Sequence, residues 1–489
     1  MENKFSKKLI YHRLINNLLI VIFLFAWMFF EFSTSENDEF IFSKQIFFIT
    51  LGISIALYAI FTIYNILYYK TSSYSLTDKE VVCTRGVIFK KKSILEYSKI
   101  HAINKRQGLL QQIFHIGTLF IDSGSTNTAF SAEIMIIEDV NIIDELMKQI
   151  SLKQGNKEEI NSSDNVYNFS IKKKIAYSLL ASLSVIFMIC VIFIGVFLVI
   201  YFTYDYIKDN NSTLMEMTLK VIYSFLSIAG FVLVFNIIFT FINFYKFEIY
   251  KDNNNITINY GLLMKNHNTF KTNRIKAIIV KSSLIKRLFS LVSIDIEVIG
   301  YGGDDDKSKR NTVLIPLCKK DEVEKYISLI ADDFTALEKN NKSKAFFPFV
   351  SWKLIFSIIP YLGVLLVSFF ISLFLNNYFI LLIVGLSLLG ILIVHLIVLF
   401  VSAILQYRFE GIGINEDKVT IYHGGIFQSK TTILKKHIIG IEDITTPRRE
   451  KKNIYSFIIH FRTNSLTNKI KVENVDKSIK DNLLNLLIR

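Results

Sequence analysis

The chain has 489 residues, of which 51% are apolar and 20% charged, with 43 phenylalanines and a formal net charge of +14. Such an apolar fraction excludes an ordinary soluble protein unless the apolar residues are segregated along the chain, and they are. Three isolated cysteines, Cys83, Cys190 and Cys318, form neither a disulfide framework nor a metal-ligand spacing.

Six apolar runs have the length of a membrane span. A helix needs roughly 17–25 residues to cross the hydrocarbon core. No small-residue cleavage site follows the first run, so we interpret it as a span and not as a signal peptide. The chain is therefore predicted to have six transmembrane helices in three hairpins, within 14–30, 46–69, 175–204, 219–245, 354–375 and 378–407.

The basic residues predict the orientation of these spans. Loops 31–45 and 205–218 hold only Lys44 and Lys208 of the 56 lysines and arginines. The positive-inside rule places both termini and all long hydrophilic segments in the cytoplasm. Their nearest partner is then the lipid bilayer with its anionic headgroups. Nucleic acid is a poor alternative, because the charge is spread through alternating strands.

Each hairpin is followed by a hydrophilic segment, at 70–152, 246–334 and 406–489. Short alternating strands lead to one amphipathic helix in each segment, which indicates a small barrel or sandwich closed by that helix. The predicted apolar helix faces are Ile142, Ile143, Leu146, Met147 and Ile150; Val323, Ile327 and Ile330; and Ile479, Leu483 and Leu487.

The segments are copies of one another. Gly86, Gly261 and Gly424 each lie 13 residues before a basic residue that opens a strand, at Lys99, Arg274 and His437. Three copies in register are an internal repeat. An aromatic and basic stretch precedes each hairpin, at Phe5, Phe169 and Phe349, and we interpret it as a membrane-entry anchor at the headgroup interface.

A turn at the centre of each copy carries the strongest candidate site. In the first two copies its apolar residues have helical spacing, whereas charged residues 447–452 replace them in the third. The turns either plug their own barrels or contact a neighbouring repeat, a partner or the bilayer. The candidate contact residues are Leu109, Leu110, Ile113, Phe114, Leu284, Ile285, Leu288 and Phe289.

Other polar features carry weaker hypotheses. Lys90, Lys91 and Lys92 could contact anionic lipid, although a solvated turn explains them equally well. Within the spans, His395 and Asn236 are the polar residues of interest, and a neutral His395 bonded to a neighbouring helix is favoured over a proton path.

No chemistry-bearing motif was found. Gly411-Ile-Gly413 lacks the third glycine of a dinucleotide fingerprint, and Asp304–Asp306 is better explained as a solvated hairpin loop than as a cation site. We therefore predict no catalytic, metal-binding or cofactor-binding residues, no cofactor and no enzymatic activity.

The chain resembles the bacterial pleckstrin-homology-like (PH-like) membrane family, and the threefold arrangement resembles its YdbT-like members. The resemblance rests on two membrane helices before each strand-rich segment and on the stretch from Arg274 to Phe289. It implies a split barrel with a C-terminal helix, and a smaller partner with two spans and one PH-like domain. It also implies a role in envelope stress or in resistance to membrane-active bacteriocins.

The predicted architecture is a multi-pass α + β protein of the bacterial cell membrane. Its predicted function is a non-enzymatic scaffold or protective assembly; the alternative is a transporter or efflux component for a peptide or lipid. The predicted parts are hairpins at 1–69, 175–245 and 354–405, PH-like domains at 70–152, 246–334 and 406–489, and linkers with anchors at 153–174 and 335–353.

The orientation can be tested with single cysteines. Cysteines placed at Asn37 and at Ser212 should react with an impermeant thiol reagent in intact cells, because both positions lie in the poorly basic loops. A cysteine at Asn254 should react only after the cells are opened, and its labelling in intact cells would contradict the predicted orientation.

Overall fold

The computed structural model describes residues 2–33, 44–123, 133–154, 164–183, 185–186, 190, 214–252, 254–298, 312–342, 347–374, 378–461 and 468–485. The chain forms two compact units. Unit 1 comprises Met1–Asp164, Tyr250–Arg274 and Ile299–Lys309, and unit 2 comprises Asn165–Ile249, Ile275–Val298 and Arg310–Arg489. We call the sequence copies repeats one, two and three; the boundary between the units passes through repeat two.

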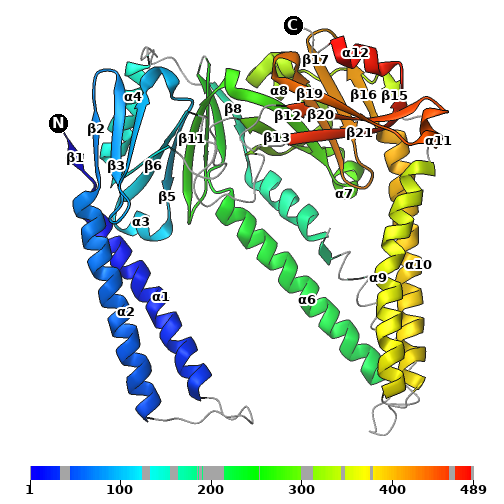
Figure 1. Cartoon of the computed structure of the whole chain (residues 1–489), viewed down its shortest axis with the longest axis horizontal. Coiled ribbons are helices and arrows are strands. Elements are labelled where there is room, and N and C mark those ends of the chain that lie inside the picture. Colours follow the sequence, from blue (N-terminus) through cyan, green and yellow to red (C-terminus); the bar gives the residue numbers. More distant parts are fainter. Residues whose placement is uncertain are drawn as a thin grey trace. The chain divides into compact units, whose positions relative to one another are not determined.

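Long helices form the hairpins. In unit 1, α1 (Lys8–Ser33) packs along α2 (Lys44–Thr71) (Figure 1). In unit 2, α9 (Phe347–Phe374) packs along α10 (Tyr378–Phe409). Helix α6 (Leu214–Asn243) also lies in unit 2. Because these helices are apolar on nearly every side, they need an apolar solvent around them.

Three of the predicted spans are confirmed as candidates by length and composition: Lys8–Glu31, Lys44–Thr71 and Ile222–Asn243. The predicted span at 175–204 lies mostly outside the described residues. In α9 and α10 the described apolar stretches are shorter, Ile358–Phe370 and His395–Phe409. The total of six spans stays a prediction.

Two sheets build the strand-rich part of unit 1. The first has the strand order β1-β2-β3-β4. The second has the order β7-β6-β5-β11-β10-β9-β8, and the boundary between the units passes through β9 and β8. The strands of the first sheet are β1 (Asn3–Lys4), β2 (Ser73–Leu76), β3 (Glu80–Arg85) and β4 (Lys91–Glu96). Those of the second are β5 (Ala102–Gln107), β6 (Ile116–Asp122), β7 (Ile134–Asp139), β8 (Asp164–Asn168), β9 (Glu248–Asp252), β10 (Asn255–Tyr260) and β11 (Lys265–Lys271).

Repeat one buries a core between its two sheets. Side chains from β3, β6 and β7 meet there, and α4 (Val140–Lys153) closes the core with Ile143, Leu146 and Ile150. Ile142, predicted on the same face, is exposed because it points off the buried stripe. The predicted sandwich closed by a helix is confirmed for this repeat.

Unit 2 also contains a seven-stranded sheet, of order β14-β13-β12-β18-β17-β16-β15, and a three-stranded sheet, β19-β20-β21. The strands of the larger sheet are β12 (Ile275–Ser282), β13 (Leu291–Val298), β14 (Thr312–Lys319), β15 (Asn341–Lys342), β16 (Gly411–Ile414), β17 (Lys418–His423) and β18 (Gln428–Leu434). Those of the smaller are β19 (Ile438–Ile444), β20 (Ile454–Phe461) and β21 (Asn468–Asp476).

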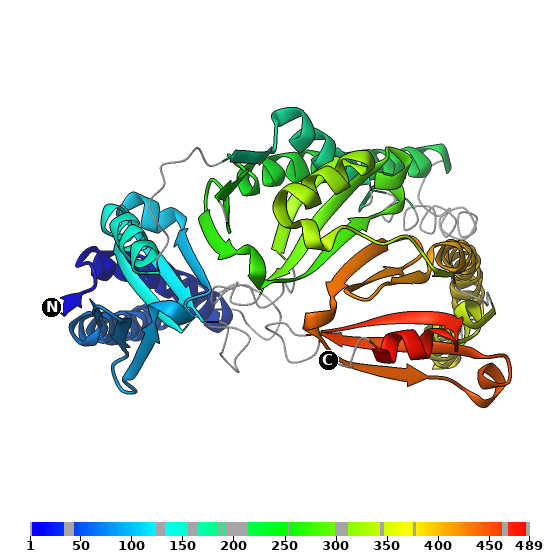
Figure 2. The ribbon, with the colours of Figure 1, turned by 90° about the horizontal axis from the view of Figure 1, so that it is seen from above.

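The closing helices of unit 2 follow the predicted pattern. Val323, Ile327 and Ile330 are buried on α8 (Val323–Ala331). Ile479 and Leu483 of α12 (Ile479–Asn485) are fully buried in the core of repeat three, while Leu487 lies outside the described residues. Seen from above, α12 (red) lies across the strands of repeat three (Figure 2).

The membrane-entry interpretation is wrong for two of its three aromatic rings. Phe5 is buried in the core of repeat one beside Tyr74, and Phe169 is buried against Phe244 and Phe247. The chain before each hairpin adds a short strand, β1, β8 or β15, to a sheet, and β1 and β8 lead directly into the buried Phe5 and Phe169. Two of these strands lie in segments predicted as linkers; the side chain of Phe349 is outside the described residues.

Candidate contact site at the junctions between repeats

Neighbouring repeats share sheets. Strand β5 of repeat one pairs antiparallel with β11 of repeat two, with Asn104 opposite Asn268. Strand β12 of repeat two pairs with β18 of repeat three in the same register, with Ile279 opposite Thr431. The first junction lies within unit 1 and the second within unit 2. Each junction therefore joins the second half of one repeat to the first half of the next.

A glycine turn stands at the same place in every repeat. Gly86, Gly261 and Gly424 have φ values of 113°, 103° and 109°, in the left-handed region that side chains disfavour. An added Cβ would also come within 2.1 Å of a carbonyl oxygen three residues later. The repeated glycines are thus required by the turns that precede β4, β11 and β18.

A short helix of one repeat binds the glycine turn of the next. In α3 (Leu109–Ile113), Nε2 of Gln112 donates to the carbonyl oxygens of Leu262 and Leu263, at 2.9 and 3.0 Å. In α7 (Leu284–Leu288), Nη2 of Arg287 donates to the carbonyl oxygens of Gly425 and Ile426, at 3.2 and 3.1 Å. Gln112 and Arg287 occupy equivalent positions, as do the two pairs of carbonyls.

The residue before each of these donors holds the helix to its own sheet. Gln111 donates to Thr118 Oγ1 at 2.9 Å, and Lys286 donates to Ser293 Oγ at 3.4 Å. In α11 (Pro447–Glu450) the equivalent Arg449 donates to Ser456 Oγ at 2.7 Å. Repeat three keeps this internal bond, but the position of Gln112 and Arg287 is held by Glu450, whose carboxylate cannot donate.

None of the eight predicted contact residues is buried. Leu288 and Phe289 are 77% and 60% exposed, Leu109, Ile113 and Leu284 are exposed, and Leu110, Phe114 and Ile285 are half-buried. Phe114 packs against the core of repeat one, whereas the exposed residues of the two turns belong to no core. Their apolar surface remains available for a contact, which stays a prediction.

Comparison with known protein families identifies the family of this chain. The model of the bacterial PH domain matches the chain three times, over residues 14–151, 175–333 and 359–487. The chain belongs to the bacterial PH domain family. This confirms the family expected from the sequence, and each match covers membrane-helix sequence together with the strand-rich domain that follows it.

A curated relative is a transmembrane protein. The chain is 25% identical over 297 residues to the UPF0699 transmembrane protein YdbT of Bacillus subtilis (strain 168). The match covers 56% of this chain and 59% of that protein, which is less than two thirds of its length.

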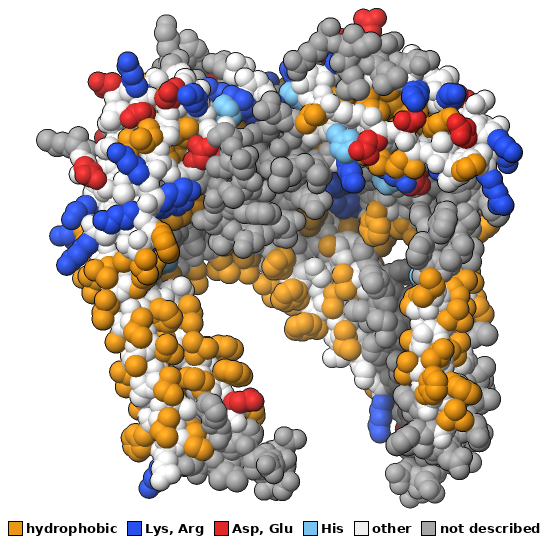
Figure 3. Space-filling model, viewed as in Figure 1, with side chains coloured by type: hydrophobic (Ala, Val, Ile, Leu, Met, Phe, Trp, Pro, Cys, Tyr) orange, Lys and Arg blue, Asp and Glu red, His pale blue; other side chains and the backbone are white. Residues whose placement is uncertain are grey.

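The first PH domain carries the predicted lipid-contact residues on an exposed turn and the first two residues of β4. Lys90, Lys91 and Lys92 are exposed beside Ile88 and Phe89. Thr71 Oγ1, at the end of α2, donates to the carbonyl oxygen of Gly86 at 2.7 Å, so this turn lies at the end of a candidate span. Figure 3 shows lysines and arginines over the domain and hydrophobic side chains along the helices below it. The lipid contact stays a prediction.

The structure does not bring the two intramembrane polar residues together. Asn236 Nδ2 donates to the carbonyl oxygen of Val232 in its own helix, at 2.9 Å. The His395 ring packs edge-on against Tyr361, and its Nε2 atom is buried with no hydrogen-bond partner among the described residues. The expected bond from His395 to a neighbouring helix is thus not present at Nε2.

A cluster of titratable side chains in the second PH domain includes Lys286 of α7. Burial raises the pKa of Asp295, which pairs with Lys281 at 2.6 Å, and burial lowers the pKa of Lys286. Burial also raises the pKa of Cys318 to about 12, so its thiol is neutral and poorly nucleophilic.

Within the described residues no group of three or more potential metal ligands occurs, and Asp304–Asp306 lies outside them.

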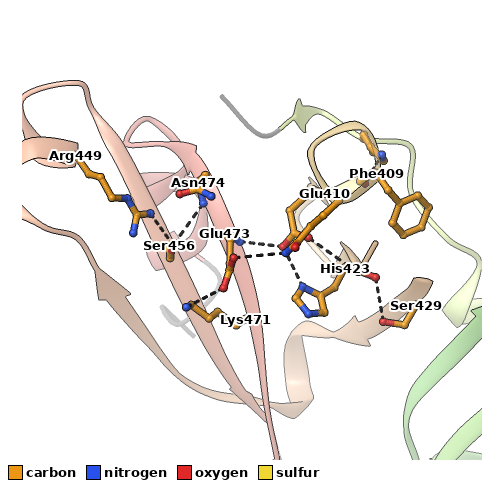
Figure 4. A network of polar contacts seen from close by, with 12 residues as sticks. Phe409, Glu410, His423, Ser429, Arg449, Ser456, Lys471, Glu473 and Asn474 are labelled. Carbon is orange, nitrogen blue, oxygen red and sulfur yellow. Dashed lines mark hydrogen bonds and ion pairs between the residues drawn. The ribbon is translucent and has the colours of Figure 1, made fainter. Parts of the chain in front are cut away.

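The joint between α10 and the third PH domain is built on a buried carboxylate (Figure 4). Glu410, fully buried, follows the last residue of α10. Its Oε1 atom lies 3.0 Å from His423 Nδ1 and accepts from the backbone N–H of Glu473 at 3.0 Å, and Oε2 accepts from Gly424 N–H at 3.4 Å. One side chain therefore connects the membrane helix to strands β17 and β21.

Replacing Glu410 with Ala should destabilise this domain. Two backbone donors and His423 would lose their acceptor, and we expect the free energy of unfolding to fall by roughly 2–4 kcal/mol. Thermal unfolding in detergent measures the change. The exposed Glu416→Ala variant is the control, with an expected change within about 0.5 kcal/mol. Equal stability of the two variants would contradict the role of Glu410.

Replacing Leu288 and Phe289 together with Lys should leave the fold intact. Both side chains are exposed, so the thermal unfolding of the full-length protein should change little. Loss of cooperative unfolding would show instead that this turn belongs to a core. The matched control replaces the buried Ile294 with Lys, which should unfold the second domain because it buries an unpaired charge.

Proposed function

We propose that this protein is a non-enzymatic scaffold of the bacterial cell membrane, with its PH domains and both termini in the cytoplasm. The observation that carries the proposal is the sharing of sheets between successive repeats. In unit 2 the strands that follow α6 and those that follow α10 meet in the β12–β18 pair. Membrane hairpins of different repeats are thus coupled by backbone hydrogen bonds outside the membrane.

The exposed apolar turns add a second contact surface to this scaffold. Leu288 and Phe289 at one junction, and Leu109 and Ile113 at the other, present apolar side chains that favour a bilayer surface or a membrane partner. The run Lys90–Lys92 supplies charge for anionic headgroups, at about 1 kcal/mol for each charge near the surface.

The family resemblance supports a protective role. Under this proposal the scaffold acts with a smaller membrane protein that has two spans and one PH-like domain, and it raises tolerance to envelope stress or membrane-active bacteriocins. The predicted external loops are short and acidic, so they neither sequester nor repel a cationic peptide. The action then lies within or beneath the membrane.

Susceptibility measurements test the protective role. Cells that express the chain with its small partner should show a higher inhibitory concentration for cationic membrane-active bacteriocins than cells with an empty vector. The Leu288→Lys/Phe289→Lys variant, matched for expression, should lose this gain. An antibiotic with an intracellular target serves as the control. Unchanged susceptibility to several such bacteriocins would contradict the protective role and leave the scaffold alone.

A further inference from the structure

At each internal junction, a strand from the second half of one repeat pairs with a strand from the first half of the next. Two strands at equivalent positions, β4 in repeat one and β19 in repeat three, have no such pairing among the described strands. Strand β4 of repeat one is equivalent to β11 and β18, but among the described strands none pairs with its outer edge. Strand β19 of repeat three is equivalent to β5 and β12, and within the described part of the chain its outer edge is also unpaired. Among the described strands, β4 and β19 each have one neighbour and form the edges of their sheets. We call them the open ends.

Exposure distinguishes β19 from its paired equivalents, whereas β4, with one buried residue of six, resembles the paired β11, with two of seven. Five of the eight residues of β12 and four of the six residues of β5 are buried, whereas no residue of β19 is. In β4 only Leu95 is buried, and Ile88 and Phe89 in the turn before it are 80% and 89% exposed. An exposed strand edge is a template for pairing with another chain.

The open ends have opposite charge. β4 and its turn carry three lysines, Lys90, Lys91 and Lys92, and one acidic residue, Glu96, whereas β19 carries Glu442 and Asp443 and no basic residue. The carboxylates also have partners within the chain, His460 for Glu442 at 3.0 Å and Lys480 for Asp443 at 2.9 Å, yet their side chains remain 59% and 39% exposed.

The internal junctions show no such complementarity. Lys105 lies opposite His267 at the first junction, and Lys281 lies opposite Ser429 at the second. When the register of these junctions is applied to the open ends, Lys92 lies opposite Asp443 and Ile94 lies opposite Ile441. Phe89 and Ile444, both exposed, take the positions of Met264 and Arg106, which are in contact at the first junction.

We propose that β19 of one copy of this protein pairs with β4 of a second copy, in the register of the internal junctions. The contact is head-to-tail, so each pairing leaves one further β4 and one further β19, and copies add into rows or rings. In unit 2, α6, α9 and α10 extend from the same side of the strands (Figure 1), so a contact of this geometry keeps added hairpins on the membrane side.

One element of the internal junction is not reproduced at the open ends. Glu450 stands where Gln112 and Arg287 donate to the next glycine turn, and it cannot donate. The complementary charges and the apolar pair Phe89 and Ile444 take over at this contact. The proposal rests on the two junctions and on the charges of the open ends, not on the protective role, and the two fail in different experiments.

Disulfide cross-linking tests the register. The full-length Ser93→Cys and Glu442→Cys variants, each carrying Cys83→Ala and Cys190→Ser, are purified separately and mixed in vesicles of zwitterionic lipid. Cys83 is replaced because it lies opposite Ser93 in the β3–β4 pair, and the remaining Cys318 is buried. Because positions 93 and 442 are directly opposite in the proposed pairing, oxidation should give a disulfide-linked pair of the two variants. The matched control mixes Ser93→Cys with Glu416→Cys, which is exposed away from the edge, and should give none.

Charge exchange tests the contact itself. Lys92→Glu and Asp443→Lys should each weaken association between labelled copies about tenfold in energy-transfer titrations, and the double variant should recover it. Equal cross-linking of the test and control pairs, or unchanged association of both single variants, would overturn the proposal. The proposal would also be overturned if β4 bound anionic vesicles or a smaller protein and the Ser93→Cys variant formed no disulfide with the Glu442→Cys variant.

Discussion

Pairing of strand edges is the constraint on which this structure depends. A sheet edge presents a row of backbone donors and acceptors, and a chain of repeated domains must cover these rows or expose them. Here the edge of one repeat pairs with the edge of the next, so the same hydrogen bonds that complete each sheet also join the repeats. The backbone hydrogen bonds of β5–β11 and β12–β18 therefore serve both the sheet of a domain and its connection to the neighbouring repeat.

Much of the fold was accessible from the sequence because it depends on local pattern. The glycine turns need φ values that only glycine adopts readily, so their spacing revealed the repeat. The helical stripes of α4, α8 and α12 were found because burial recurs with the helical period. An alternating pattern places a residue on a face of a sheet, but it does not identify the strand that lies alongside. The shared sheets could not be predicted for that reason.

The candidate site was found only in part, for a chemical reason. The apolar spacing of the turns identified α3 and α7, and their exposure agrees with a contact role that remains to be tested. Gln112 and Arg287 were missed because an amide and a guanidinium share little except that both donate to carbonyl oxygens. Phe5 and Phe169 were misassigned because an aromatic ring beside lysines suits a membrane interface and a domain core equally well. Only the position of β1 and β8 in their sheets separates these two environments.

Covalent linkage explains why charge complementarity appears at the open ends and not at the internal junctions. Within one chain the next repeat is always near, so the effective concentration of the matching edge is high and neutral or like-charged strands can pair. An edge that meets a separate molecule has no such advantage, and opposite charges raise the rate and specificity of encounter. Repeat three carries acidic residues on its edge strand β19, and repeat one carries lysines on its edge strand β4 and the turn before it. Charge complementarity is thus absent between the strands that pair within the chain. It is present between β4 and β19, which in the proposed contact belong to two different molecules.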